Sequence, residues 1–155
     1  MGGIVLYVNN DDGREAYSNV LRERGLVVLE ATRPEDALGL LNIHQPDVIV
    51  TDMVFSDSPI DGSGFVREVR SRVDEATSIV VLSRYVRADD REQARAAGAD
   101  LYLMRPALPT ALLFEVQRAL ILRRSGRRLP WNWGHRPPSV PIPVKIERRN
   151  RTKSA

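Results

Sequence analysis

Residues 47–52 read DVIVTD, an apolar stretch that runs from one aspartate to another. Its middle residues are aliphatic or β-branched without interruption, whereas a strand with one wet face would alternate between apolar and polar residues. The chain contains four similar stretches, which are IVLYV at 4–8, LVVLEA at 26–31, SIVVLS at 78–83 and DLYLM at 100–104. The sequence therefore predicts five short strands that are covered on both faces.

Helical patterns lie between these strands. The segment TRPEDALGLL at 32–41 has the form of a capping box, with Thr32 at the cap and Glu35 three residues after it. Two other segments end at Gly25 and Gly98, which are typical helix stops. Five strand–helix units in succession predict an α/β fold, because right-handed crossovers produce a doubly wound parallel sheet with helices on both faces.

Charge is distributed unevenly along the chain. Residues 123–155 hold ten Lys and Arg and one acid, Glu147, whereas the residues before them hold 13 Arg and 19 acids. The net charge of +3 therefore divides into about −6 for the body and about +9 for the C-terminal part. The C-terminal part is also rich in proline and poor in apolar residues, which disfavours a long helix or a core. We predict a folded domain at 1–123 and a basic, Pro-rich, disordered tail at 124–155.

The composition disfavours several classes of protein. The chain has no cysteine, which removes disulfide frameworks and thiolate metal sites and agrees with a reducing cytosol. No apolar run approaches the roughly 18 residues of a membrane span. No Gly-rich loop follows the first strand, so a dinucleotide-binding site is not favoured. We expect a cytoplasmic protein.

Polar residues stand at the ends of the predicted strands. Asn9 and Asn10 follow the first strand, Asp52 ends the third, Ser83 ends the fourth and Arg105 follows the fifth. In an open parallel sheet the functional crevice lies at the carboxyl ends of the strands. These side chains are therefore the candidate site.

As a set, several motifs resemble the CheY-like receiver domain of two-component response regulators, over about residues 3–123. The motifs are DVIVTD (47–52), the DG pair (61–62) before a helix, VVLS (80–83) and AGADLYLMRP (97–106). The resemblance implies a (βα)5 flavodoxin-like fold with five parallel strands in the order 2-1-3-4-5. It also implies that Asp52 accepts a phosphoryl group from a histidine kinase, that the hydroxyl of Ser83 bonds that group, and that Tyr102 is a rotamer switch.

The site departs from the family pattern at two places. The family normally has two acids after the first strand, which hold Mg²⁺ together with the phosphoacceptor, and this chain has Asn9 and Asn10 there. The family lysine after the fifth strand is replaced by Arg105. Asp52 and Arg105 sum to a charge of about zero, and a guanidinium can grip a carboxylate bidentately without a metal. We therefore expect weak Mg²⁺ binding and weak or absent phosphorylation at Asp52.

A shifted register is the alternative at the first strand. A bulge, or a strand extended by two residues, would bring Asp11 and Asp12 to the site in place of the two amides. The sequence leaves both arrangements open.

These observations favour a stand-alone, atypical receiver protein that acts through protein–protein interaction and is not an enzyme. The expected partners are a histidine kinase or another signalling protein. A homodimer through the fourth helix, fifth strand and fifth helix is a further expectation, since Phe114 and Ile121 add an apolar strip to the last helix.

Two other functions remain as alternatives. The basic tail, with Trp131 and Trp133, could make the protein a nucleic-acid-binding adaptor. A small flavodoxin-like domain that binds phosphate esters is the other, although the missing second carboxylate near Asp52 argues against it.

Overall fold

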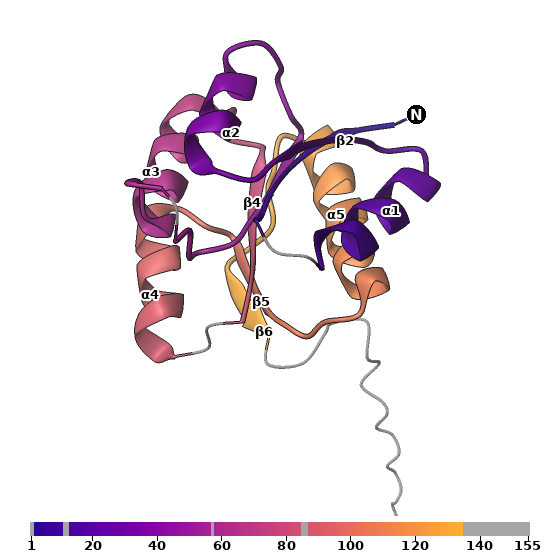
Figure 1. The fold of residues 1–155 in the computed structure, drawn as a ribbon. Coiled ribbons are helices and arrows are strands. Elements are labelled where there is room, and N and C mark those ends of the chain that lie inside the picture. Colours follow the sequence, from indigo (N-terminus) through magenta and orange to yellow (C-terminus); the bar gives the residue numbers. More distant parts are fainter. Residues whose placement is uncertain (1, 11–12, 57, 85–86, 135–155) are drawn as a thin grey trace, which may run out of the picture.

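The strands form one parallel sheet (Figure 1). The computed structural model describes residues 2–10, 13–56, 58–84 and 87–134. The strand order is β2-β1-β3-β4-β5-β6, so the predicted α/β fold with five parallel strands in the order 2-1-3-4-5 is confirmed and a sixth strand is added to it. The strands are β1 (Ile4–Val8), β2 (Val27–Ala31), β3 (Val48–Thr51), β4 (Ser78–Ser83), β5 (Leu101–Met104) and β6 (Asn132–Gly134).

Five helices cover the sheet on both faces. Helices α1 and α5 pack together on one face, and α2, α3 and α4 lie on the other (Figure 1). The helices are α1 (Arg14–Glu23), α2 (Pro34–Leu41), α3 (Gly62–Arg72), α4 (Ala88–Ala97) and α5 (Pro109–Arg124). Among the described residues, no helix combines the length and apolarity that a membrane span requires.

Alternate residues of each strand belong to two separate hydrophobic clusters. In β1, Val5 and Tyr7 point into the cluster under α1 and α5, whereas Leu6 and Val8 point into the cluster under α2, α3 and α4. All four are fully buried. Both faces of each strand must therefore be apolar, and this explains the unbroken apolar runs in the sequence. Each large aliphatic side chain so buried contributes about 1.5–3 kcal/mol.

The helix ends agree in part with the sequence patterns. The predicted capping box of α2 is wrong, because the residue before the helix is Arg33 and no side chain caps its first turn. The predicted stop of α4 at Gly98 is confirmed, since Gly98 has a φ of 118°. A side chain there would be strained by that φ, and its Cβ would lie 2.9 Å from the Arg70 side chain.

The first residues of the predicted tail are part of the fold. Helix α5 ends at Arg124, and the chain then turns back so that residues 127–134, which we call the C-terminal strap, pack on the domain. Leu129 is only 2% exposed, and its N–H donates to Ser78 Oγ at 2.8 Å. The predicted boundary at residue 123 is therefore too early, because the folded part continues to the end of β6 at Gly134. The remainder of the predicted tail, 135–155, lies outside the described residues.

Candidate functional site

Asp52 lies at the carboxyl end of β3 and is held by the turn that follows it. Its side chain is 7% exposed. One carboxylate oxygen, Oδ1, accepts hydrogen bonds from the N–H groups of Met53 at 2.6 Å and Val54 at 3.4 Å. Backbone amides thus stabilise negative charge at Asp52 and fix the side chain at the end of the strand.

The Asp–Gly pair at the start of α3 shapes that turn. The side chain of Asp61 caps α3 by accepting a hydrogen bond from the Gly64 N–H at 2.7 Å. Gly62 begins the helix against the carbonyl of Met53, where a Cβ would overlap the carbonyl atoms. The absence of a side chain at Gly62 therefore allows α3 to start directly beneath the residue whose amide holds Asp52.

Ser83 connects Asp52 to β5. Its side chain is fully buried at the end of β4 and is hydrogen-bonded both to Asp52 and to the hydroxyl of Tyr102. An ionised carboxylate can only accept hydrogen bonds, so the Ser83 hydroxyl is the donor to Asp52 when Asp52 is ionised. Tyr102 is fully buried, which places its ring inside the domain. The structure thus brings Asp52, Ser83 and Tyr102 together as one hydrogen-bonded chain.

Burial dominates the electrostatics of Asp52. It raises the pKa of the Asp52 carboxyl above its ordinary value of 3.8, and the hydrogen bonds from Met53, Ser83 and Val54 and the charge of Arg105 oppose that shift without overcoming it. The neighbouring hydrogen bonds and positive charge therefore do not fully offset the cost of burying the ionised carboxylate of Asp52.

Arg105 lies close enough to Asp52 for its charge to lower the pKa of that carboxyl. The bidentate clamp between the two side chains stays a prediction. The guanidinium carbon of Arg105 lies 5.7 Å from the centre of the Tyr17 ring, on α1. The Tyr17 hydroxyl in turn donates to the Ala107 carbonyl at 2.7 Å. Arg105 therefore packs against the aromatic face of Tyr17, which is a favourable position for a guanidinium. Its charge acts on Asp52 through space.

The two amides after β1 have different environments. Asn9 is fully buried and extends the ladder with β2, since its N–H donates to the Ala31 carbonyl at 3.0 Å. The register of β1 and β3 pairs Val8 with Thr51, so its next step places Asn9 beside Asp52. Asn10 is exposed. Asp11 and Asp12 lie outside the described residues, so their part in the alternative register stays a prediction.

Comparison with known proteins identifies the family. The sequence matches the response regulator receiver domain family over residues 5–117. The chain belongs to this family. It is a receiver domain of two-component signalling, as the strand-end motifs predicted.

Individual relatives agree with this assignment. An uncharacterised 14.6 kDa protein of Leptolyngbya boryana is 30% identical over 116 residues, which are 74% of this chain and 87% of that protein. The transcriptional regulatory protein PrrA of Mycobacterium tuberculosis is 34% identical over 79% of this chain. The match spans only 51% of PrrA, so the function of the whole PrrA protein is not assigned to this chain. Among solved structures, the chemotaxis response regulator CheY4 of Vibrio cholerae matches with a TM-score of 0.68 and 28% identity, over 77% of this chain and 100% of that one.

Receiver domains generally bind Mg²⁺ at the phosphorylation site, but the described residues fit this ion poorly. Mg²⁺ requires hard oxygen ligands in near-octahedral geometry and is usually bound through carboxylates. Asp52 is the carboxylate of the described site, and its Oδ1 already accepts two amides, while Asn9 beside it is neutral. No group of three or more His, Cys, Asp or Glu suited to a metal occurs in the described part of the chain.

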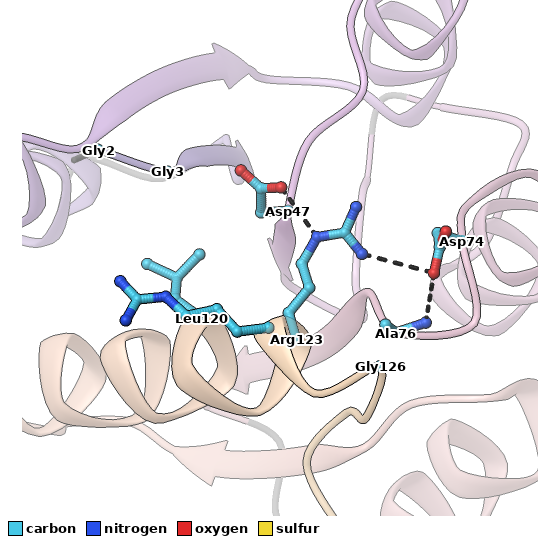
Figure 2. Close-up of a pocket in the computed structure, with 9 residues that line it drawn as sticks. Gly2, Gly3, Asp47, Asp74, Ala76, Leu120, Arg123 and Gly126 are labelled. Carbon is cyan, nitrogen blue, oxygen red and sulfur yellow. Dashed lines mark hydrogen bonds and ion pairs between the residues drawn. The ribbon is translucent and has the colours of Figure 1, made fainter.

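A cavity of about 570 Å³ lies away from this site, at the amino ends of the strands (Figure 2). Arg123 lies in its wall, donates to Asp47 at 2.9 Å and reaches Asp74 at 3.5 Å. Asp47 precedes β3, whereas Asp52 follows it. The three side chains join α5 to the entries of β3 and β4, so we interpret this region as a structural clasp.

Proposed function

We propose that this receiver domain is an atypical switch in which Mg²⁺-dependent phosphorylation of Asp52 is weak or lost. The observation that carries the proposal is the position of Asn9, a neutral and fully buried amide beside Asp52. In the family this end of the first strand supplies acids for the metal. An amide oxygen can coordinate Mg²⁺, but it brings no charge to hold the ion.

The reactivity of Asp52 depends on that lost charge. Transfer of a phosphoryl group to a carboxylate brings two anions together, and metal ions normally neutralise the developing charge. Here the nearby cation is Arg105, which is engaged with the Tyr17 ring. We therefore expect slow phosphorylation, and we expect the protein to act by binding other proteins and not as an enzyme.

The connection from Asp52 to β5 nevertheless supports a switching role. A phosphoryl group on Asp52 would draw the Ser83 hydroxyl toward its oxygens, and Ser83 would then release or reposition Tyr102. Asp52 and Tyr102 both interact with the single hydroxyl of Ser83. We therefore expect two conformations of this group of side chains, and phosphorylation would shift the population from one to the other. Receiver domains imply signalling partners such as histidine kinases.

The homodimer expected through the fourth helix, fifth strand and fifth helix stays a prediction. The edge of β5 is paired with β6 and is not open to a second subunit in this arrangement. Exposed apolar side chains do remain on the outer surface of α5, since Phe114 is 42% and Ile121 is 60% exposed. These two side chains are the apolar part of the predicted face that α5 leaves exposed.

Incubation with a small phosphodonor and Mg²⁺, followed by intact-protein mass spectrometry, tests this proposal. We expect little or no acyl phosphate on the wild-type chain. The double variant Asn9→Asp/Asn10→Asp is the matched comparison and should gain labelling, because it returns two carboxylates to the site. Asp52→Asn in that background should abolish the gain. Stoichiometric labelling of the wild type at Asp52 would contradict the proposal.

The nucleic-acid alternative gains no support from the described part of the tail. Trp131 lies against α4, with the Arg95 guanidinium carbon 5.7 Å from its ring centre, and Arg128 is paired with Asp100. Both side chains are thus engaged with the domain, although Arg128 remains 40% exposed. Removing residues 127–155 while measuring nucleic-acid binding at several salt concentrations would test this alternative.

A further inference from the structure

The C-terminal strap is anchored to a buried carboxylate. Asp100 is 5% exposed and lies between two guanidinium groups, with Arg70 2.6 Å from Oδ2 and Arg128 2.8 Å from Oδ1. Arg128 also donates to the Glu75 carbonyl at 3.0 Å. Burial raises the pKa of the Asp100 carboxyl, and the Ile79 amide and both guanidinium groups oppose that shift. Asp100 therefore fixes the start of the strap.

The rest of the strap covers the open edge of the sheet. Leu129 packs into the cluster under α1 and α5, and Trp131 packs against the cluster under α2, α3 and α4. The N–H of Asn132 donates to the Asp100 carbonyl at 3.1 Å and starts the pairing of β6 with β5. An uncovered edge strand presents a row of unpaired backbone groups that other chains can pair with. The strap occupies that edge.

The hold of the strap on the domain is small. Strand β6 has three residues, and the Arg128 side chain that anchors the strap is 40% exposed. A segment held by so few contacts opens more readily than the core strands do. Its attachment can therefore respond to modest changes in β5.

Tyr102 links the strap to Asp52. In the ladder of β5 and β6, Tyr102 is the register partner of Trp133. Its ring belongs to the same cluster against which Trp131 packs. The hydroxyl of Tyr102 is bonded to Ser83, which bonds Asp52. Tyr102, which contacts Ser83, is therefore one of the three β5 residues with which the strap is paired.

We propose that the C-terminal strap is the output element of the Asp52 site: the Asp52–Ser83–Tyr102 chain holds the strap on the edge of β5, and its disruption opens that edge to an extended segment of a partner protein. This inference rests on the proposed switching role of Asp52 but not on its phosphorylation. The partner segment should resemble the strap in chemistry, with an arginine for Asp100 and apolar or aromatic residues after it, as in Arg128, Leu129 and Trp131. Peptide recognition by addition of a strand to a sheet edge is a general mode.

Hydrogen exchange in the full chain tests the connection without any phosphodonor. Amide exchange in a peptide covering 127–134 is compared among the wild type, Asp52→Asn, Tyr102→Phe and the double variant, each normalised to a peptide from β1. We expect each single variant to raise exchange in the strap by about fivefold, since a charge-assisted hydrogen bond is roughly twice as strong as a neutral one. The double variant should exchange no faster than Tyr102→Phe alone.

Asp100→Asn is the positive control for the exchange measurement, because it weakens the Arg128–Asp100 ion pair that anchors the strap and leaves Asp52 unchanged. It should raise strap exchange whichever residue occupies position 52. Unchanged strap exchange in Asp52→Asn, or an equal effect of Asp52→Asn with and without Tyr102→Phe, overturns the connection. Unchanged exchange in Asp100→Asn overturns the anchor itself. The labelling experiment with a phosphodonor fails or succeeds independently of these results.

A synthetic peptide with the sequence of residues 127–134 tests the docking surface. We expect it to bind Tyr102→Phe up to about fivefold more tightly than the wild type, because the competing strap is released more often in the variant. A peptide with alanine in place of the residues equivalent to Arg128 and Trp131 should not bind. Equal affinity of the first peptide for both proteins, or binding of the alanine peptide, contradicts the proposal.

Discussion

Replacing Asp100 with alanine should be among the most destabilising single changes that can be made at the C-terminal edge of this receiver. The carboxylate accepts hydrogen bonds from Arg70, from Arg128 and from the Ile79 N–H at 2.8 Å. Removing it leaves the Arg70 guanidinium, whose side chain is 18% exposed, without its anionic partner. The same change loosens the strap at Arg128.

The magnitude follows from the burial of each partner. Loss of one member of a buried ion pair costs about 3–5 kcal/mol. Arg70 keeps its hydrogen bonds to the carbonyls of Gly98 and Thr77, and Arg128 is 40% exposed, so part of that cost is avoided. We therefore expect Asp100→Ala to lower the free energy of unfolding by about 2–4 kcal/mol. Arg128→Ala should lower it by about 0.5–1 kcal/mol, because a half-exposed pair is screened by solvent.

Urea denaturation at pH 7 measures both values. With a typical dependence of about 2 kcal/mol per molar urea, Asp100→Ala should lower the midpoint by about 1–2 M and Arg128→Ala by less than about 0.5 M. A midpoint for Asp100→Ala within about 0.2 M of the wild type would refute the reasoning, since that difference lies below the cost of any buried pair. Equal effects of the two variants would show that the cost comes from the strap and not from Arg70.

Three other changes have defined outcomes. Because burial raises the pKa of Asp52, its ionisation opposes folding as the pH rises from the unfolded value of 3.8 through the folded pKa. Asp52→Asn should therefore be more stable than the wild type at pH 7, and urea midpoints should show that this gain shrinks toward pH 4. A variant that is less stable than the wild type at pH 7 would contradict this. Gly98→Ala should cost about 1–2 kcal/mol in thermal or urea unfolding, because the φ of 118° is strained for alanine and the Cβ meets Arg70; an unchanged melting temperature would show that the turn adapts. Arg123→Ala should cost about 1 kcal/mol through its partly exposed bond to Asp47, and an effect above about 3 kcal/mol would mean that the clasp is stronger than its exposure implies.

The fold could be predicted from the sequence because both faces of each strand are buried. Unbroken runs such as Ile4–Val8 admit few other structures when helical patterns separate them. The cap of α2 could not be predicted reliably, because Thr32 and Arg33 are adjacent and Pro34 suits the first turn after either. Local propensity does not choose between neighbouring residues; tertiary packing does.

The strap was missed for a different reason. Residues 127–134 belong to a C-terminal part that is rich in proline and arginine, and the average composition of that part conceals one buried leucine and a three-residue strand. The alternation of Trp131, Asn132 and Trp133 was the available signal, since it is typical of a short strand with one covered face. The anchoring role of Asp100 could not be read from the chain, because Arg70 and Arg128 are 30 and 28 residues away.

At the site, the sequence located the side chains but not all of their contacts. Strand ends in a parallel sheet converge, so Asp52 and Ser83 could be placed together with Tyr102. The contact between Arg105 and Tyr17 could not be predicted from the sequence, because the two residues belong to separate elements that only the fold brings together.

The most direct test of the account is a Mg²⁺ titration of the wild-type chain and of Asn9→Asp/Asn10→Asp, followed by calorimetry or by chemical shifts of the Asp52 and Met53 amides. We expect no saturable Mg²⁺ binding to the wild type at low millimolar concentration and clear binding to the double variant. Saturable uptake by the wild type at or below that concentration, lost on Asp11→Asn, would contradict the central claim that Asn9 has replaced the acidic metal ligand of this receiver.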